Sequence, residues 1–139
     1  MFTRTDFTVG LLAWAASSAV VMLAAWFGFH FLKPSGIPYP PEHDFWHAAA
    51  RWDGSYYRAI ARDGYTGAAQ PETIAFFPGY PLAMRGIWKL TGWRLEFAAV
   101  AAAQLLLAAS FVLLHCLARL RTGDRKSAAL AVLAFAGLP

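Results

Sequence analysis

The sequence predicts an all-α integral membrane protein, and three observations lead to this prediction. The chain is 58% hydrophobic and only 14% charged, whereas soluble domains carry about 25% charged residues. Residues 7–32 and 97–118 contain no Asp, Glu, Lys or Arg. As helices these two runs measure about 39 Å and about 33 Å, which exceeds the hydrocarbon core of about 30 Å. Finally, basic residues gather directly after the second run.

The first run, residues 7–32, predicts a transmembrane helix. The alternative is a cleaved signal peptide, whose apolar region spans only about 7–15 residues and whose flank is positively charged. The run is longer than that, and Asp6 lies in its flank. We therefore expect this helix to remain in the membrane.

The second run, residues 97–118, predicts a further transmembrane helix, followed by a cytoplasmic loop over residues 119–126. The basic residues of that loop are Arg119, Arg121, Arg125 and Lys126. Because positive loops remain in the cytoplasm, this loop and the N-terminus are expected there, with residues 33–96 on the opposite side. The net charge of +4 is thus attributed to membrane topology, and no nucleic-acid partner is expected.

Residues 127–139 predict the start of a third transmembrane helix that stops short of a full crossing. The chain is therefore expected to be the N-terminal part of a longer multi-pass protein. Gln104 and His115 fall on one face of the second span, where polar side chains mark a substrate path or a hydrogen bond to a neighbouring helix. We expect the hydrogen bond.

The external segment, residues 33–96, is expected to carry two helices along the membrane interface, over about residues 44–62 and 81–90. The first has a polar stripe opposite an apolar and aromatic face, and Pro81 suits a first helical turn. The stripe comprises Asp44, His47, Arg51, Ser55, Arg58 and Arg62, and the opposite face Phe45, Ala49, Trp52, Tyr56 and Ile60. Asp53 falls on the aromatic face. Gly54 leaves a second possibility, a split in which Asp53 caps a helix that starts there.

Asp53 is the candidate catalytic residue. On an apolar face, desolvation raises the pKa of a carboxyl group, and such a carboxylate can take a proton from an attacking hydroxyl. The competing interpretation is an N-cap, and the two roles are compatible. Arg58, Arg62 and Arg85 are candidates for binding a phosphate, against the alternative of a solvated stripe.

His43 and His47 are candidate metal ligands, because they have the i, i+4 spacing that places two imidazoles on one helix face. Glu42 and Asp44 lie beside them, but the HExxH pattern is not present. We expect a polar interfacial turn here, with no metal and no cofactor. Cys116 lies within the second span and has no cysteine partner in the chain.

An ordered set of short motifs follows the first span. It consists of Arg51-Trp52-Asp53-Gly54, Tyr57, Ile60-Ala61, Gly64-Tyr65 and Phe76-Phe77-Pro78-x-Tyr80-Pro81-Leu82. In this location the set resembles the PIG-V-like mannosyltransferases, which are C-type membrane glycosyltransferases that use lipid-phosphate sugars as donors. The resemblance covers about residues 45–85 and the flanking spans. Members of that family are several times longer than this chain.

The resemblance implies a hexosyltransferase of the mannosyltransferase kind, with Asp53 as general base. A sugar would pass from a polyprenyl phosphate, or dolichyl phosphate in eukaryotes, to a glycan or lipid hydroxyl with inversion. The candidate substrate-binding residues are Arg51, Trp52, Tyr57, Arg62, Tyr65, Phe77, Tyr80 and Arg85. The high alanine content suggests a bacterial plasma-membrane relative of the eukaryotic enzymes of GPI-anchor biosynthesis, which lie in the ER membrane. The fragment alone is expected to be inactive. The alternative is a non-enzymatic membrane protein that binds a partner or anionic lipid through its aromatic loop.

Overall fold

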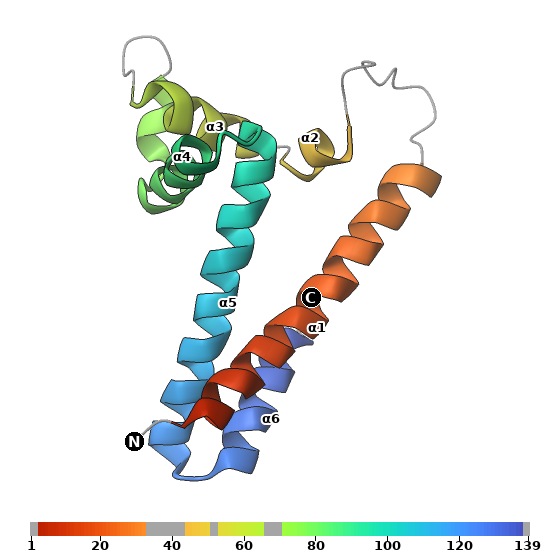
Figure 1. The fold of residues 1–139 in the computed structure, drawn as a ribbon, viewed down its shortest axis with the longest axis vertical. Helices are drawn as coiled ribbons and strands as arrows, with labels where there is room; N and C mark the ends of the chain where they lie inside the picture. Colours follow the sequence, from red (N-terminus) through yellow and green to blue (C-terminus); the bar gives the residue numbers. More distant parts are fainter. Residues whose placement is uncertain (1–2, 33–43, 51–52, 66–70, 138–139) are drawn as a thin grey trace. The chain divides into compact units, whose positions relative to one another are not determined.

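The computed structural model describes residues 3–32, 44–50, 53–65 and 71–137. All regular elements in these ranges are helical (Figure 1), which confirms the predicted all-α class. In chain order they are α1 (Arg4–Phe31), α2 (Phe45–Ala49), α3 (Gly54–Asp63), the 3₁₀ helix η1 (Pro71–Ala75), α4 (Gly79–Thr91), α5 (Leu95–Thr122) and α6 (Arg125–Ala136). They form two compact units: residues 1–25 with 104–139 are unit 1, and residues 26–103 are unit 2.

Helices α1 and α5 are long and apolar enough to cross a membrane, as the two uncharged runs predicted. Each has 28 residues, or about 42 Å of helix. Only 11% of the apolar window of α1 and 22% of that of α5 is buried within the protein. The core helix of a soluble protein would be mostly buried, so this exposure favours a lipid environment.

The core of unit 1 is formed where α1, α5 and α6 meet. Ala13, Phe111 and Val132 come from these three helices and are buried together. Gly10 allows a close approach, because a Cβ at this position would lie 2.7 Å from the Cα of Val112. Small residues let helix backbones approach closely in lipid, where apolar surface alone gives little driving force for association.

Polar contacts also join the helices of unit 1. The Gln104 Oε1 accepts hydrogen bonds from the Trp14 Nε1 at 3.0 Å and from the Ser18 Oγ at 2.7 Å. This is the bond to a neighbouring helix that the sequence predicted for Gln104. His115 is 1% exposed, and its Nε2 lies 3.6 Å from the Oδ1 of Asp6, which is 2% exposed.

Asp6 links the ends of all three helices in unit 1. Its Oδ2 accepts hydrogen bonds from the backbone N and the hydroxyl of Thr3, both at 2.8 Å, which caps the start of α1. Its Oδ1 lies 4.0 Å from the Arg119 Nε and 3.7 Å from the Arg125 Nε. The sequence had given Asp6 no role beyond its position in the flank of the first span.

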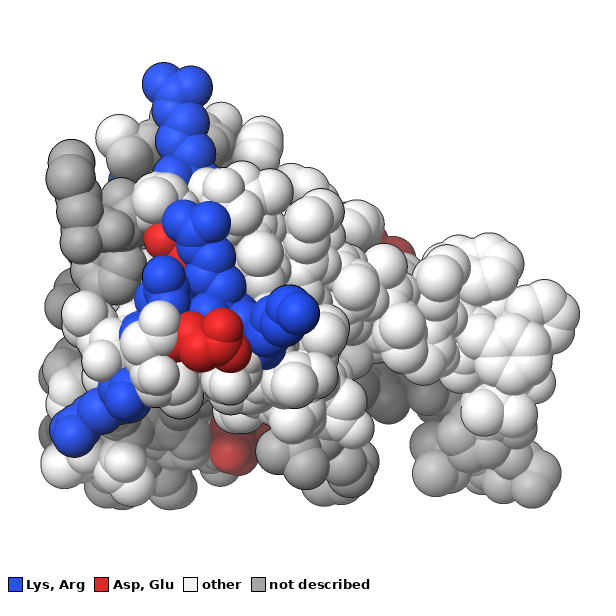
Figure 2. All heavy atoms as spheres, turned by 90° about the horizontal axis from the view of Figure 1, so that it is seen from below, with Lys and Arg blue, Asp and Glu red and all other residues white. Residues whose placement is uncertain are grey.

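The same end of unit 1 carries the basic cluster. Figure 2 views the molecule from below, with Lys and Arg side chains gathered around acidic ones. Asp124 begins α6, because its carboxylate accepts hydrogen bonds from the Ser127 backbone N at 2.7 Å and the Ser127 hydroxyl at 2.8 Å. The Ser127 N–H also lowers the pKa of Asp124 below its usual value. Helix α5 ends at Thr122 and is followed by Gly123 with φ +69°, a conformation that glycine adopts without strain.

Unit 2 packs α3 and α4 against the first turns of α5. The buried residues of this core are Ala50, Ala61, Met84, Ala98, Ala99 and Ala102. The three alanines of α5 leave room for Met84 and for the ring of Tyr80, whose hydroxyl donates to the Ala99 carbonyl oxygen at 2.9 Å. Burial raises the pKa of Tyr80.

The structure corrects the single helix expected over residues 44–62. Helix α2 ends at Ala49 and α3 starts at Gly54, so the split that Gly54 suggested is present. The ends of other helices also differ from the predicted ones. An uncharged run marks only the apolar part of a helix, whereas capping groups determine where the helix ends. Helix α5 thus starts at Leu95 and runs to Thr122, through part of the loop expected at residues 119–126. Helix α4 covers Gly79–Thr91 rather than residues 81–90.

Candidate functional site

Asp53 stands at the N-cap position of α3. Its backbone is helical, with φ −56° and ψ −19°, and its side chain makes no capping hydrogen bond. Its carbonyl oxygen accepts a hydrogen bond from the Tyr57 N at 3.1 Å. The side chain is exposed, so its expected placement on a desolvated aromatic face is wrong, because α3 begins only after this residue. Asp53 therefore occupies the cap position with a carboxylate that contacts no charged or hydrogen-bonding group of the described residues.

An aromatic cluster joins α3 to α4. The Tyr57 ring lies 5.0 Å from the Phe76 ring and 5.0 Å from the Tyr80 ring, both edge-on, and Tyr56 stacks on Phe76 at 5.0 Å. The Tyr65 hydroxyl donates to the Phe76 carbonyl oxygen at 2.6 Å. Three residues predicted to bind substrate, Tyr57, Tyr65 and Tyr80, thus belong to one cluster. Their contacts there stabilise the packing of unit 2.

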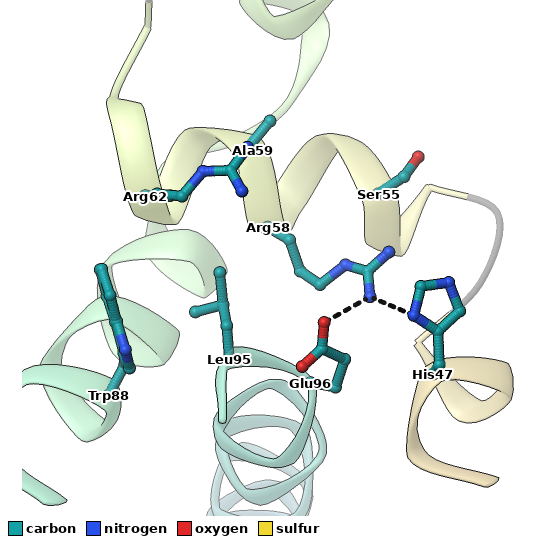
Figure 3. Close-up of a pocket in the computed structure, with 8 residues that line it drawn as sticks. All are labelled: His47, Ser55, Arg58, Ala59, Arg62, Trp88, Leu95 and Glu96. Carbon is teal, nitrogen blue, oxygen red and sulfur yellow. Dashed lines mark hydrogen bonds and ion pairs between the residues drawn. The ribbon is translucent and has the colours of Figure 1, made fainter. Parts of the chain in front are cut away.

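A pocket of about 360 Å³ opens beside α3 (Figure 3). Three polar residues of α3, at spacings of three and four, lie along its wall, and α2, α4 and α5 complete it. The polar and aromatic residues that line the pocket are His47, Ser55, Arg58, Arg62, Trp88 and Glu96. This volume falls in the range of small-molecule sites, about 300–1,000 Å³.

Arg58 is the central charge of this pocket. Its Nη1 lies 3.1 Å from the Glu96 Oε1 and 3.5 Å from the His47 Nδ1, as the dashed lines of Figure 3 show. The Arg58 and Glu96 side chains are only 15% and 21% exposed. Since a guanidinium only donates hydrogen bonds, the His47 Nδ1 is the acceptor in this contact.

A second arginine extends this ion pair into a chain of charges. The Arg94 Nε lies 3.7 Å from the Glu96 Oε2, and Arg94 also pairs with the Asp44 carboxylate. Asp44 in turn accepts a hydrogen bond from the His47 N at 2.9 Å and so caps α2. The bond from the His47 N–H, followed by the contact with Arg94, lowers the pKa of Asp44 below its usual value.

We expect the order of α2 to depend on pH through Asp44. Because its pKa is lower in the folded chain, its stabilising effect is complete above the ordinary Asp pKa of about 3.9 and is lost as the pH falls through the folded value. Hydrogen-exchange protection of the His47 amide should therefore decline in acid. Asp44→Asn retains a capping oxygen and should abolish this decline, whereas Asp44→Ala should lower protection at every pH. An Asp44→Asn variant with an unchanged acid decline would exclude Asp44 as the titrating group.

The remaining predicted site residues are dispersed. Arg51 and Trp52, with Glu42 and His43 of the candidate metal ligands, lie outside the described residues. Arg62 reaches the pocket and pairs with Asp63 at 3.1 Å in an exposed contact. Arg85 is exposed on α4, outside the residues that line the pocket, and Phe77 is 80% exposed. Within the described ranges, no three His, Cys, Asp or Glu side chains gather as metal ligands would.

Sequence reasoning missed Glu96 and Trp88 as pocket residues. Glu96 lies 38 positions from Arg58, and the only signal for it was its position as the last acid before the second span. Comparisons of the chain with family models, with curated proteins and with solved structures found no match in any of the three.

Proposed function

We propose that this chain carries the first external loop of a membrane glycosyltransferase, a hexosyltransferase of the mannosyltransferase kind. The observation that supports the proposal most is the Asp53 carboxylate, which is exposed at the start of α3 without a partner among the described residues. The next turns of the same helix carry Arg58 and Arg62 at the pocket. A free base close in sequence to phosphate-binding cations is what transfer from a phosphate-linked sugar requires.

In the proposed reaction the acceptor hydroxyl oxygen attacks the anomeric carbon of a sugar held on polyprenyl phosphate. The new C–O bond forms as the bond from the anomeric carbon to the phosphate oxygen breaks, with inversion. The polyprenyl phosphate leaves with the electron pair, and Asp53 takes the hydroxyl proton. Arg62 and Arg85 would bind phosphate oxygens, and the exposed rings of Tyr65 and Phe77 would contact the sugar or the prenyl chain.

The proposed location follows from the charge distribution. The basic residues around Asp124 are placed in the cytoplasm, with the N-terminus of the chain, by the positive-inside tendency. By the same tendency residues 33–96 would lie on the other side of the membrane, either of the bacterial plasma membrane or of the ER membrane. The acceptor, a glycan or a lipid, would be met there at the bilayer surface.

A second candidate function is binding of an anionic lipid surface without chemistry. Helix α4 favours it, because the exposed Leu82 and Leu90 share the helix with the exposed cations Arg85 and Lys89. Neither cation makes an ion pair within the described part of the chain. Apolar and basic side chains together are typical of interfacial helices.

A transfer assay decides between the two candidates. The full-length gene product in nanodiscs would be given a radiolabelled polyprenyl-phosphate mannose and a mixed lipid and glycan acceptor extract. We expect label to move to acceptor, with polyprenyl phosphate released in equal amount. Binding to anionic vesicles with no transfer from any lipid-linked hexose would favour the lipid-binding function instead.

A further inference from the structure

We propose that the Arg58 pocket is a binding site for an organic phosphate, and that Glu96 is its built-in competitor. In the structure the Glu96 carboxylate pairs with Arg58. A phosphate group would replace this carboxylate on Arg58, and Glu96 would then pair with Arg94. This inference rests on the pocket alone and does not require that Asp53 be catalytic.

Arg58 requires an anion. Its side chain is 15% exposed, and its described acidic partner is Glu96 at 3.1 Å. Removing the partner of a largely buried charge leaves that charge uncompensated and is strongly unfavourable. An incoming anion that replaces Glu96 avoids this penalty, because Arg58 stays paired throughout the exchange.

Glu96 has another cation within reach. Its Oε2 lies 3.7 Å from the Arg94 Nε, and the Arg94 side chain is 60% exposed. Asp44, itself fixed by the His47 N–H, holds Arg94 from the other side. A small rotation of the Glu96 carboxylate would therefore exchange one arginine for another, and neither arginine would be left without an acid.

The residues that line the pocket indicate the class of its ligand. Arg58 and Arg62 are four residues apart on α3 and both line the pocket, as neighbours on one helix face do. Two guanidinium groups match the oxygens of a phosphate through paired hydrogen bonds. The exposed Arg62–Asp63 pair, with side chains 63% and 50% exposed, offers little resistance to such a ligand. Trp88 and Leu95 add an apolar wall, which suits a phosphate that bears a carbon substituent.

The test is a binding measurement on the full chain in phosphatidylcholine nanodiscs, with inorganic phosphate as the probe and its ³¹P linewidth as the readout. Glu96→Gln should bind phosphate about three- to tenfold more tightly, because the competing carboxylate is gone. Arg58→Gln should weaken binding about tenfold. Arg121→Gln, at an exposed arginine outside the pocket lining, is the matched control and should bind like the wild type.

Arg94→Gln gives a second, opposite-signed prediction that leaves every pocket-lining residue in place. Without Arg94, Glu96 has only Arg58 among its described cation partners, so phosphate should bind more weakly than to the wild type. If circular dichroism shows that Glu96→Gln loses helix content, the phosphate affinity of Arg94→Gln still tests the proposal. The proposal would be overturned if Glu96→Gln did not raise the phosphate affinity and Arg94→Gln did not lower it. Equal phosphate binding by Arg58→Gln and Arg121→Gln would also overturn it.

A second arm separates a soluble phosphate from a lipid headgroup. Nanodiscs that contain phosphatidic acid would be analysed by native mass spectrometry for lipid retained on the chain. If lipid retention rises in Glu96→Gln and falls in Arg58→Gln, the pocket binds a lipid phosphate. If lipid retention is equal in both variants while inorganic phosphate binding still changes between them, the pocket binds a soluble phosphate. Because no turnover is measured, failure of sugar transfer would leave these outcomes unchanged.

Discussion

Asp53→Asn is expected to lower the rate of sugar transfer by about 10²–10⁴-fold, the contribution of a positioned general base. Asparagine preserves the size and the N-cap preference of the side chain, and Asp53 makes no side-chain capping bond that the change would remove. Helix α3 and membrane insertion should therefore remain intact. Initial rates at saturating polyprenyl-phosphate sugar measure the effect, with the full-length gene product in nanodiscs.

Asp124→Asn is the matched control for Asp53→Asn. Asp124 is also an exposed carboxylate at a helix N-cap, and Asn can replace its bond to the Ser127 N–H. This variant should transfer sugar at the wild-type rate. Transfer by Asp53→Asn within a few-fold of the wild type would remove Asp53 from the mechanism.

Met84→Ala is expected to destabilise unit 2 by about 2–5 kcal/mol, the usual range for truncating a fully buried methionine. Met84 is 0% exposed and lies in the core that joins α3, α4 and α5. The three helices around it also bear Arg58, Trp88 and Glu96. The pocket should consequently lose order together with the core.

Leu90→Ala provides the comparison, since Leu90 sits on the same helix and is 89% exposed. Its effect should stay within about 0.5 kcal/mol. Unfolding of both variants by denaturant in one detergent, followed by tryptophan fluorescence, gives the difference. Equal losses in the two variants would mean that α4 is not packed through Met84.

The sequence was informative where a single local property decides the structure. Uncharged runs identified the two long helices, because a charge in the hydrocarbon core is costly. The hydrogen bond predicted for Gln104 is confirmed, since a half-buried amide on a long apolar helix has few other partners. Gly54 was recognised as a possible break, and the break is where glycine suggested it.

The pocket was beyond the reach of sequence reasoning because its contacts are distant along the chain. Arg58 meets Glu96 across 38 positions, and Arg94 meets Asp44 across 50. A helical wheel shows which residues share a face, but not which acid a given arginine will meet. The misplacement of Asp53 has the same origin, because the wheel assumed one continuous helix where the chain forms two.

The most direct test of the account is the side of the membrane on which α3 lies. In a Cys116→Ser background, a thiol at the exposed position 55 (Ser55→Cys) would be treated with a membrane-impermeant maleimide in intact cells. A thiol at the exposed position 126 (Lys126→Cys) serves as the cytoplasmic reference. We predict that position 55 reacts before permeabilisation and position 126 only afterwards. Reaction of position 55 only after permeabilisation would contradict transfer from a lipid-linked sugar on the outer side.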